Sequence, residues 1–222
     1  AIERAARSHG LTHIGRLTSN LIRPVTIGRL VVDVTADYIG RNAGHFAATL
    51  IADDKEVGRF TALAQRESQV EIPSSLPGDP VPTIAPPDRA AAASFPFERD
   101  GLGYANLVET RIVKGTMFNG PSTVWFRMRH PLVAGEETSG YQRVAVAADS
   151  GNGISAALDF QKYLFVNCDL TINLFRRPIG EWICLQAQTL FGGNGCGLAE
   201  SALYDEAGLV GRATQSLAVR LR

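Results

Sequence analysis

The sequence predicts an α+β protein that contains two copies of one unit, each an antiparallel sheet wrapped around a helix. The first observation is a repeat, because residues 17–23 (LTSNLIR) return as 170–176 (LTINLFR), and 57–61 (VGRFT) return as 210–214 (VGRAT). Both pairs have the same separation along the chain, as two copies of one domain require. The other observations are a proline-rich stretch between the copies and a helical pattern followed by long strand patterns.

The second copy shows its elements in a clear order. Strand patterns at 105–113 and 122–129 precede a helical pattern at 140–149. Three long strand patterns follow, at 162–175, 182–190 and 197–204. A hairpin turn at 205–208 then leads to a last strand at 210–219. The predicted apolar face of the helix consists of Tyr141, Val144, Ala145 and Ala148.

The first copy repeats this order from Leu17 onward, after the end of a helix at 1–8 and with a turn at 53–55. Residues 72–82 (IPSSLPGDPVP) are rich in proline, which interrupts both helices and sheet ladders. We therefore predict a first unit at 1–72, a proline-rich linker at 73–96 and a second unit at 97–222. Because the chain begins inside a helical pattern, we expect an upstream segment with the first strand and most of the helix of the first unit.

Composition excludes several classes of function. The 222-residue chain has a formal net charge of zero with scattered basic residues, so binding of nucleic acid is not predicted. No apolar run approaches the ~20 residues of a membrane-spanning helix, and the charged start is unlike a signal peptide. Three cysteines without CxxC spacing favour a reduced, cytoplasmic protein with neither disulfides nor a zinc site. The sequence indicates no cofactor and no metal.

The order of these elements and several short motifs resemble the double-hotdog acyl-CoA thioesterases, the group that includes bacterial thioesterase II. The motifs are residues 148–153 (ADSGNG), 166–171 (VNCDLT), 177–178 (RP), 181–182 (EW) and 213–216 (ATQS). The resemblance implies a tandem double hotdog that acts on acyl-CoA and associates into homo-oligomers. It also implies a catalytic set in the second copy. Asp149 matches the aspartate at the helix end, Gln215 matches the glutamine of the last strand, and Asn167 stands where thioesterase II has a threonine.

These three residue types are suited to hydrolysis of a thioester. Asp149 would accept a proton from water or orient it, while the amides of Asn167 and Gln215 fix its position. Backbone N–H groups at Gly151 and Gly153 would stabilise the oxyanion. The first copy has Ala62 where the second has Gln215, so the catalytic set is expected in the second copy alone.

Each assignment has a structural alternative. Asp149 could simply end the helix in a turn, Gln215 could be a surface residue, and Asn167 could bridge a bulge while Asp169 acts as the polar partner. The alternative functions are a non-catalytic acyl-CoA binding protein that uses the same groove and a purely structural subunit. The four histidines are interpreted as surface or interface residues, and the three cysteines as buried structural residues: His9, His13, His45, His130, Cys168, Cys184 and Cys196.

Overall fold

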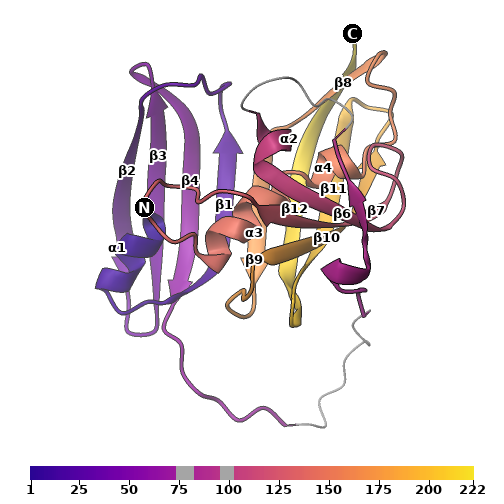
Figure 1. Cartoon of the computed structure of the whole chain (residues 1–222). Helices are drawn as coiled ribbons and strands as arrows, with labels where there is room; N and C mark the ends of the chain where they lie inside the picture. Colours follow the sequence, from indigo (N-terminus) through magenta and orange to yellow (C-terminus); the bar gives the residue numbers. More distant parts are fainter. Residues whose placement is uncertain (74–82, 96–102) are drawn as a thin grey trace.

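The computed structural model describes residues 1–73, 83–95 and 103–222, and these residues contain one twelve-stranded antiparallel sheet with short helices (Figure 1). The strands of the first half are β1 (His13–Leu21), β2 (Leu30–Ile39), β3 (Ala43–Ala52) and β4 (Lys55–Gln65). Those that follow are β5 (Ala91–Ala93), β6 (Val108–Lys114), β7 (Ser122–Met128), β8 (Tyr163–Asn167), β9 (Asp169–Leu174), β10 (Trp182–Phe191), β11 (Cys196–Asp205) and β12 (Gly208–Leu221). The helices are α1 (Ile2–Ser8), α2 (Tyr104–Leu107), α3 (Gly140–Ala148) and α4 (Gly151–Ile154), with a 3₁₀ turn, η1, at Pro87–Arg89.

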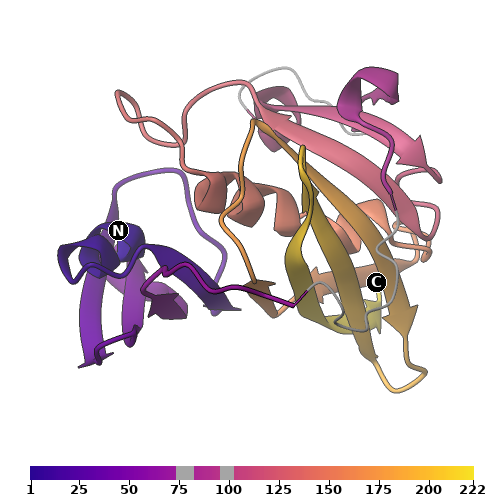
Figure 2. The same cartoon turned by 90° about the horizontal axis from the view of Figure 1, so that it is seen from below.

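The order of strands in the sheet is β2-β3-β4-β1-β9-β12-β11-β10-β7-β6-β5, and β8 pairs with β12. The sheet curves, and α3 lies inside the curve against β7, β9, β10 and β11 (Figure 2). Alternate residues of β10 therefore face two environments. Ile183 and Leu185 belong to the main core around α3, whereas Trp182 and Cys184 belong to a second cluster on the outer face.

The two halves meet where the repeated motifs pair with each other. Thr18 of β1 and Thr171 of β9 occupy the same position in the repeat, 153 residues apart, and they face each other in the β1–β9 ladder. Their hydroxyl oxygens are 3.2 Å apart. The internal registers also repeat, because β1 pairs Thr18 with Thr61 and β9 pairs Thr171 with Thr214. An approximate two-fold axis therefore passes through the Thr18–Thr171 pair.

Helix α3 begins and ends close to the predicted limits. Its N-cap is Ser139, whose hydroxyl accepts from the backbone of Gln142 while the Gln142 side chain accepts from the backbone of Ser139, which forms a capping box. The buried face contains Tyr141, Val144, Ala147 and Ala148. Ala147 thus takes the place predicted for Ala145, which is partly buried. Helix α1 agrees with the helix end predicted at 1–8, whereas α3, with nine residues, is shorter than the long helix predicted for each unit.

The predicted strand at 162–175 is interrupted at Cys168. On one side Asn167 faces Leu217 of β12, and on the other Thr171 faces Thr214. The segment from Asn167 to Thr171 therefore has one residue more than the segment of β12 that it faces, Thr214 to Leu217, and this extra residue forms a β-bulge. The bulge turns the side chains that follow it, which matters for the choice between Asn167 and Asp169 below. The other strands predicted for the second copy form within one or two residues of their expected limits, except β6, which begins three residues later than predicted, after α2.

The range predicted as a linker contains ordered elements. Residues 83–95 of this range include η1 and β5, and β5 pairs with β6 through Ala92 and Arg111. The indole N–H of Trp125 donates to the carbonyl of Ala85 at 2.8 Å, so this part of the chain is held against the outer face of the sheet. The last part of the predicted linker thus adds a short edge strand, β5, to the sheet of the second half.

The two halves differ in how their equivalent strands are covered. Strand β10 pairs on both sides, with β11 and β7, whereas β2 lies at the edge of the sheet formed by the described residues. Leu30 and Val32 of β2 are exposed, although their equivalents Ile183 and Leu185 are almost fully buried. The second half therefore has the more complete core around its helix. Among the residues described, no helix is long and apolar enough to span a membrane.

Candidate active site

Asp149 lies at a kink between α3 and α4. Asp149 and Ser150 both keep right-handed helical backbone angles, so the chain bends without leaving the helical conformation. At the bend Ser150 donates its backbone N–H to Ala147 instead of Val146, which leaves the Val146 carbonyl to another donor. The phenol of Tyr104 donates to that carbonyl at 3.0 Å, and the Nε2 of Gln215 donates to the Asp149 carbonyl at 3.2 Å. Side chains that replace backbone partners in this way are a known cause of helix kinks.

The carboxylate of Asp149 is held by Asn167. The Nδ2 of Asn167 donates to Asp149 Oδ1 at 2.9 Å. Burial raises the pKa of Asp149, and the hydrogen bond from Asn167 offsets part of that rise. Asp149 is nevertheless exposed at its surface, at the wall of the apolar cavity, so a water molecule can reach the carboxylate. A carboxylate in this setting is a better proton acceptor than one in free solution.

Gln215 lies beneath the kink rather than at the surface. It is 2% exposed, and its Oε1 accepts from the backbone N–H of Asn152 at 2.9 Å. Both ends of its amide therefore bind backbone atoms next to Asp149. A Cβ atom at Gly151 would lie 2.9 Å from both Gln215 Oε1 and Ser201 Oγ, so glycine is needed for this close approach. The structure thus brings Asp149, Asn167 and Gln215 together at one bend of the chain.

The geometry distinguishes Asn167 from Asp169 as the partner of Asp149. Because of the bulge, the carboxylate of Asp169 faces β12 and accepts from the backbone N–H of Ser216 at 2.6 Å and from its hydroxyl at 3.0 Å. Asn167 alone of the two binds Asp149. Gly153 is partly buried, and a Cβ atom there would make an ordinary contact with Phe118 at 3.6 Å.

An apolar cavity of about 510 Å³ opens beside Asp149. Strands β1 and β4 of the first half line one side of it, and α2, α3, β6, β7, β9 and the segment after β7 line the other. The lining residues are Leu17, Ser19, Leu21, Phe60, Tyr104, Leu107, Val108, Met128, His130, Pro131, Leu132, Ala145, Val146, Asp149 and Leu170. Among these residues Asp149 is the one carboxylate. Mostly apolar walls with a few polar groups are typical of ligand sites.

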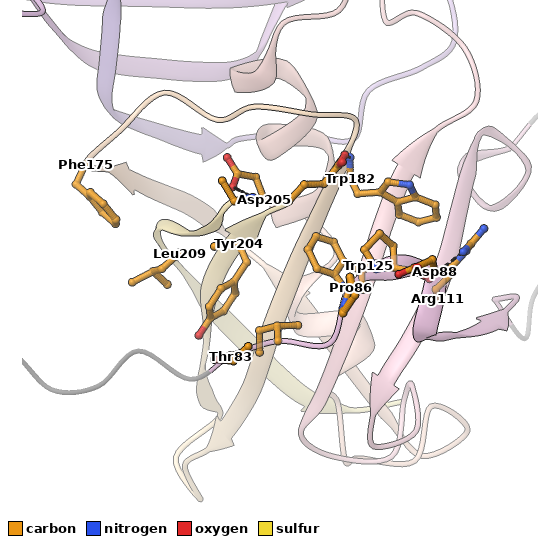
Figure 3. Close-up of a pocket in the computed structure, with 15 residues that line it drawn as sticks. Thr83, Pro86, Asp88, Arg111, Trp125, Phe175, Trp182, Tyr204, Asp205 and Leu209 are labelled. Atoms are coloured by element: carbon orange, nitrogen blue, oxygen red, sulfur yellow. Dashed lines mark hydrogen bonds between the residues drawn. The ribbon is translucent and has the colours of Figure 1, made fainter.

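A larger cavity of about 820 Å³ lies on the outer face of the sheet. Figure 3 shows Trp125 and Trp182 on one side of it and Asp205 at the end of β11. Burial alone would raise the pKa of Asp205, but bonds from Arg176 and from two backbone N–H groups lower it overall. This carboxylate is therefore ionised and fully engaged, which leaves it no role as a proton acceptor. Asp149, Asn167 and Gln215 do not line this outer cavity.

The structure places the histidines and cysteines in different environments, some buried and some exposed. His13, predicted to lie at the surface or an interface, is buried between the halves, with Nε2 2.9 Å from the Leu174 carbonyl. Cys184 is buried as predicted, and burial raises its pKa. Cys168 and Cys196 are exposed, so the prediction of buried structural residues was wrong for both. The bulge and a hairpin turn place them outside the core. Within the described ranges, no three His, Cys, Asp or Glu side chains are grouped to hold a metal.

Tyr104 is a site residue that the sequence did not reveal. Its hydroxyl lies 2.7 Å from Ser150 Oγ, and its ring lines the apolar cavity. Although Tyr104 is 42% exposed overall, the atoms packed around its hydroxyl raise its pKa to about 12, with a further contribution from the charge of Asp149, so the phenol stays protonated. Nothing in the local pattern separates this tyrosine from the other four of the chain.

A helix that lies inside a curved antiparallel sheet, as α3 does here, is the arrangement of the α+β proteins with the hotdog fold. A family model described as the acyl-CoA thioesterase C-terminal domain matches residues 86–219. The chain therefore belongs to this acyl-CoA thioesterase family, as the resemblance predicted.

Solved structures agree in fold. A TesB protein from Mycobacterium avium subsp. paratuberculosis is 15% identical, with a TM-score of 0.72 over 97% of this chain and 82% of that one. A hotdog protein of unknown function from Alicyclobacillus acidocaldarius is 18% identical, with a TM-score of 0.72 over 98% and 83%. A thioesterase II described as putative, from Thermobifida fusca, is 15% identical, with a TM-score of 0.73 over 97% and 81%. No curated protein sequence gives a significant match.

Proposed function

We propose that this protein hydrolyses acyl-CoA thioesters to a free acid and CoA. The observation that carries the proposal is the carboxylate of Asp149, which Asn167 holds at the wall of an apolar cavity. Membership of the acyl-CoA thioesterase family supports the choice of substrate. The acyl chain would lie in the cavity with its thioester carbonyl near Asp149, and the CoA moiety would extend toward solvent.

In the proposed reaction, Asp149 accepts a proton from a water molecule while the water oxygen attacks the thioester carbonyl carbon. The tetrahedral intermediate then collapses and the carbon–sulfur bond breaks, and the leaving thiolate of CoA takes up the proton that Asp149 accepted, which restores the carboxylate. Asn167 holds the carboxylate in position and favours its ionised form. The raised pKa of Asp149 makes the carboxylate a stronger base than an exposed aspartate.

The roles of the remaining residues follow from their contacts. Gln215 binds backbone atoms on both sides of Ser150, so we assign it to holding the bend that carries Asp149. The backbone N–H groups of Gly151 and Gly153, which follow Asp149 in the chain, are the proposed oxyanion donors. No covalent intermediate is required.

We also infer that the chain is a tandem double hotdog, with one unit in residues 1–72, a second in 97–222 and the linker between them. The support is the repeated strand register at an offset of 153 residues and the pairing of Thr18 with its equivalent Thr171. Because the first half supplies Leu17, Leu21 and Phe60 to the cavity, the substrate site would need both units. Homo-oligomers of such chains and a cytoplasmic location remain part of the proposal.

The alternative is an acyl-CoA binding protein without activity, which the use of both ends of the Gln215 amide to bind the backbone would also suit. The test is to measure release of CoA from a panel of acyl-CoA thioesters by the parent protein and by Asp149→Ala, together with binding of a non-hydrolysable thioether analogue. Loss of hydrolysis with binding retained supports the enzyme. Binding without hydrolysis in the parent protein supports the alternative. Asp33→Ala, on the exposed strand β2, is a matched control that should leave both properties unchanged.

A further inference from the structure

The bend that carries Asp149 is held from two sides. Gln215 binds it from beneath, within the core, through the carbonyl of Asp149. Tyr104 binds it from the side of the apolar cavity, three residues earlier, through the carbonyl of Val146. Tyr104 belongs to α2, an element far from the bend in sequence, so its contact is a tertiary one.

The single proton of the phenol determines the direction of these bonds. If Tyr104 donates to the Val146 carbonyl at 3.0 Å, the 2.7 Å contact with Ser150 must be donated by the Ser150 hydroxyl. Tyr104 then binds residues on both sides of Asp149 in the chain. Its phenol remains protonated near neutral pH, which this pattern requires.

The Val146 carbonyl points out of the C-terminal end of α3, where the backbone presents partial negative charge. A donor at this carbonyl offsets part of that charge close to the Asp149 carboxylate. Loss of the donor would disfavour a second negative charge at the same end of the helix and would loosen the bend.

We propose that Tyr104 is a positioning residue for Asp149, holding the kink between α3 and α4 so that the carboxylate faces the cavity. This inference rests on the proposed hydrolysis, and it assigns Tyr104 no contact with the reacting atoms. The ring is a separate feature, because it packs 5.8 Å from Phe95 and forms cavity wall whether or not the hydroxyl is present.

The test variant is Tyr104→Phe, which keeps the ring and removes the hydroxyl. We expect kcat for acyl-CoA hydrolysis to fall about fivefold to tenfold, the effect of losing one aligned hydrogen bond at a site that depends on geometry. Binding of the thioether analogue should change less than kcat because the apolar wall is intact. The acid limb of the pH profile should move to higher pH. The other titratable side chain that lines the cavity with Tyr104 and Asp149 is His130, which the variant leaves unchanged.

Two further variants keep the proposal falsifiable. Tyr38→Phe removes a hydroxyl from an exposed tyrosine on β2 and should have no effect. Ser150→Ala removes one contact of the phenol but keeps its bond to Val146, so its effect should be smaller than that of Tyr104→Phe. An equal or larger effect of Ser150→Ala, or an unchanged kcat and pH profile in Tyr104→Phe, would overturn the proposal.

A readout without turnover separates this inference from the proposed function. The pKa of Asp149 can be followed by NMR of ¹³C-labelled aspartate carboxyl groups, with Asp149→Asn to assign the signal. A higher pKa of Asp149 in Tyr104→Phe than in the parent supports the positioning role even if the parent hydrolyses nothing. An identical pKa in both proteins would refute it.

Discussion

Replacing Asn167 by alanine removes the one side-chain hydrogen bond to the Asp149 carboxylate within residues 1–73, 83–95 and 103–222. A hydrogen bond to a charged group contributes about 1.5–3 kcal/mol. The lower value applies here, because the Asp149 side chain is exposed and Asn167 is only partly buried. About 1.4 kcal/mol corresponds to a factor of ten in rate. We therefore expect kcat/KM for acyl-CoA hydrolysis to fall about tenfold at pH 7.

The same variant has a predicted pH signature. Asn167 binds the ionised form of Asp149 and so lowers its pKa, against the larger effect of burial. Without Asn167 the pKa of Asp149 rises and less of the base is ionised at a given pH. The acid limb of the pH–rate profile should move to higher pH, and activity should recover partly in alkaline buffer.

The assay is release of CoA, followed with a thiol reagent across the pH range. The control is Asn173→Ala, which removes an exposed asparagine on the neighbouring strand β9. If Asn167→Ala keeps the kcat/KM and the acid limb of the parent, the assignment of Asn167 as the partner of Asp149 is wrong.

Three other predictions follow from contacts. Gly151→Ala should destabilise the fold by about 1–3 kcal/mol in chemical denaturation and should lower kcat, because the added Cβ atom would displace Gln215. Gly153→Ala has room for a methyl group and should be close to neutral. Similar effects of the two substitutions would refute this reading. Arg176→Ala should cost about 3 kcal/mol of folding stability, because Asp205 would stay buried without its cation and keep only two backbone N–H bonds. Since the Asp205 pKa is lowered, this stabilisation should be present above the ordinary aspartate pKa and lost as pH falls through the folded value; a variant as stable as the parent at pH 7 would contradict it. Phe60→Ala should enlarge the cavity and so shift the acyl preference toward longer or bulkier chains. Competition between two acyl-CoA substrates of different length measures the ratio of their kcat/KM values. An unchanged ratio would place the acyl chain elsewhere.

Much of the fold could be predicted because the pattern of the chain repeats. The repeated motifs around Thr18 and Thr171 mark equivalent strands, and alternation of apolar residues fixed the limits of β10, β11 and β12 to within two residues. The bulge at Cys168 could not be predicted, because it depends on how β12 aligns with two different strands. The strand β5 was missed because its three alanines carry no strand signal and follow a proline-rich segment.

The candidate site was predicted in part. The sequence placed Asp149 at the end of a helix, and the contrast between Gln215 and Ala62 singled out the second copy. It could not show that Gln215 lies beneath the bend, since that depends on which face of β12 turns inward. Tyr104 was missed because its partners are a backbone carbonyl and a hydroxyl of a distant segment.

The central claim, that Asp149 directs a water molecule to the thioester carbonyl, is tested most directly by a single turnover in H₂¹⁸O. With enzyme in excess over acyl-CoA, the released acid should carry one ¹⁸O atom from the first turnover. Unlabelled acid, with ¹⁸O appearing in the peptide that contains Asp149, would show that the carboxylate attacks the substrate itself and would contradict the account.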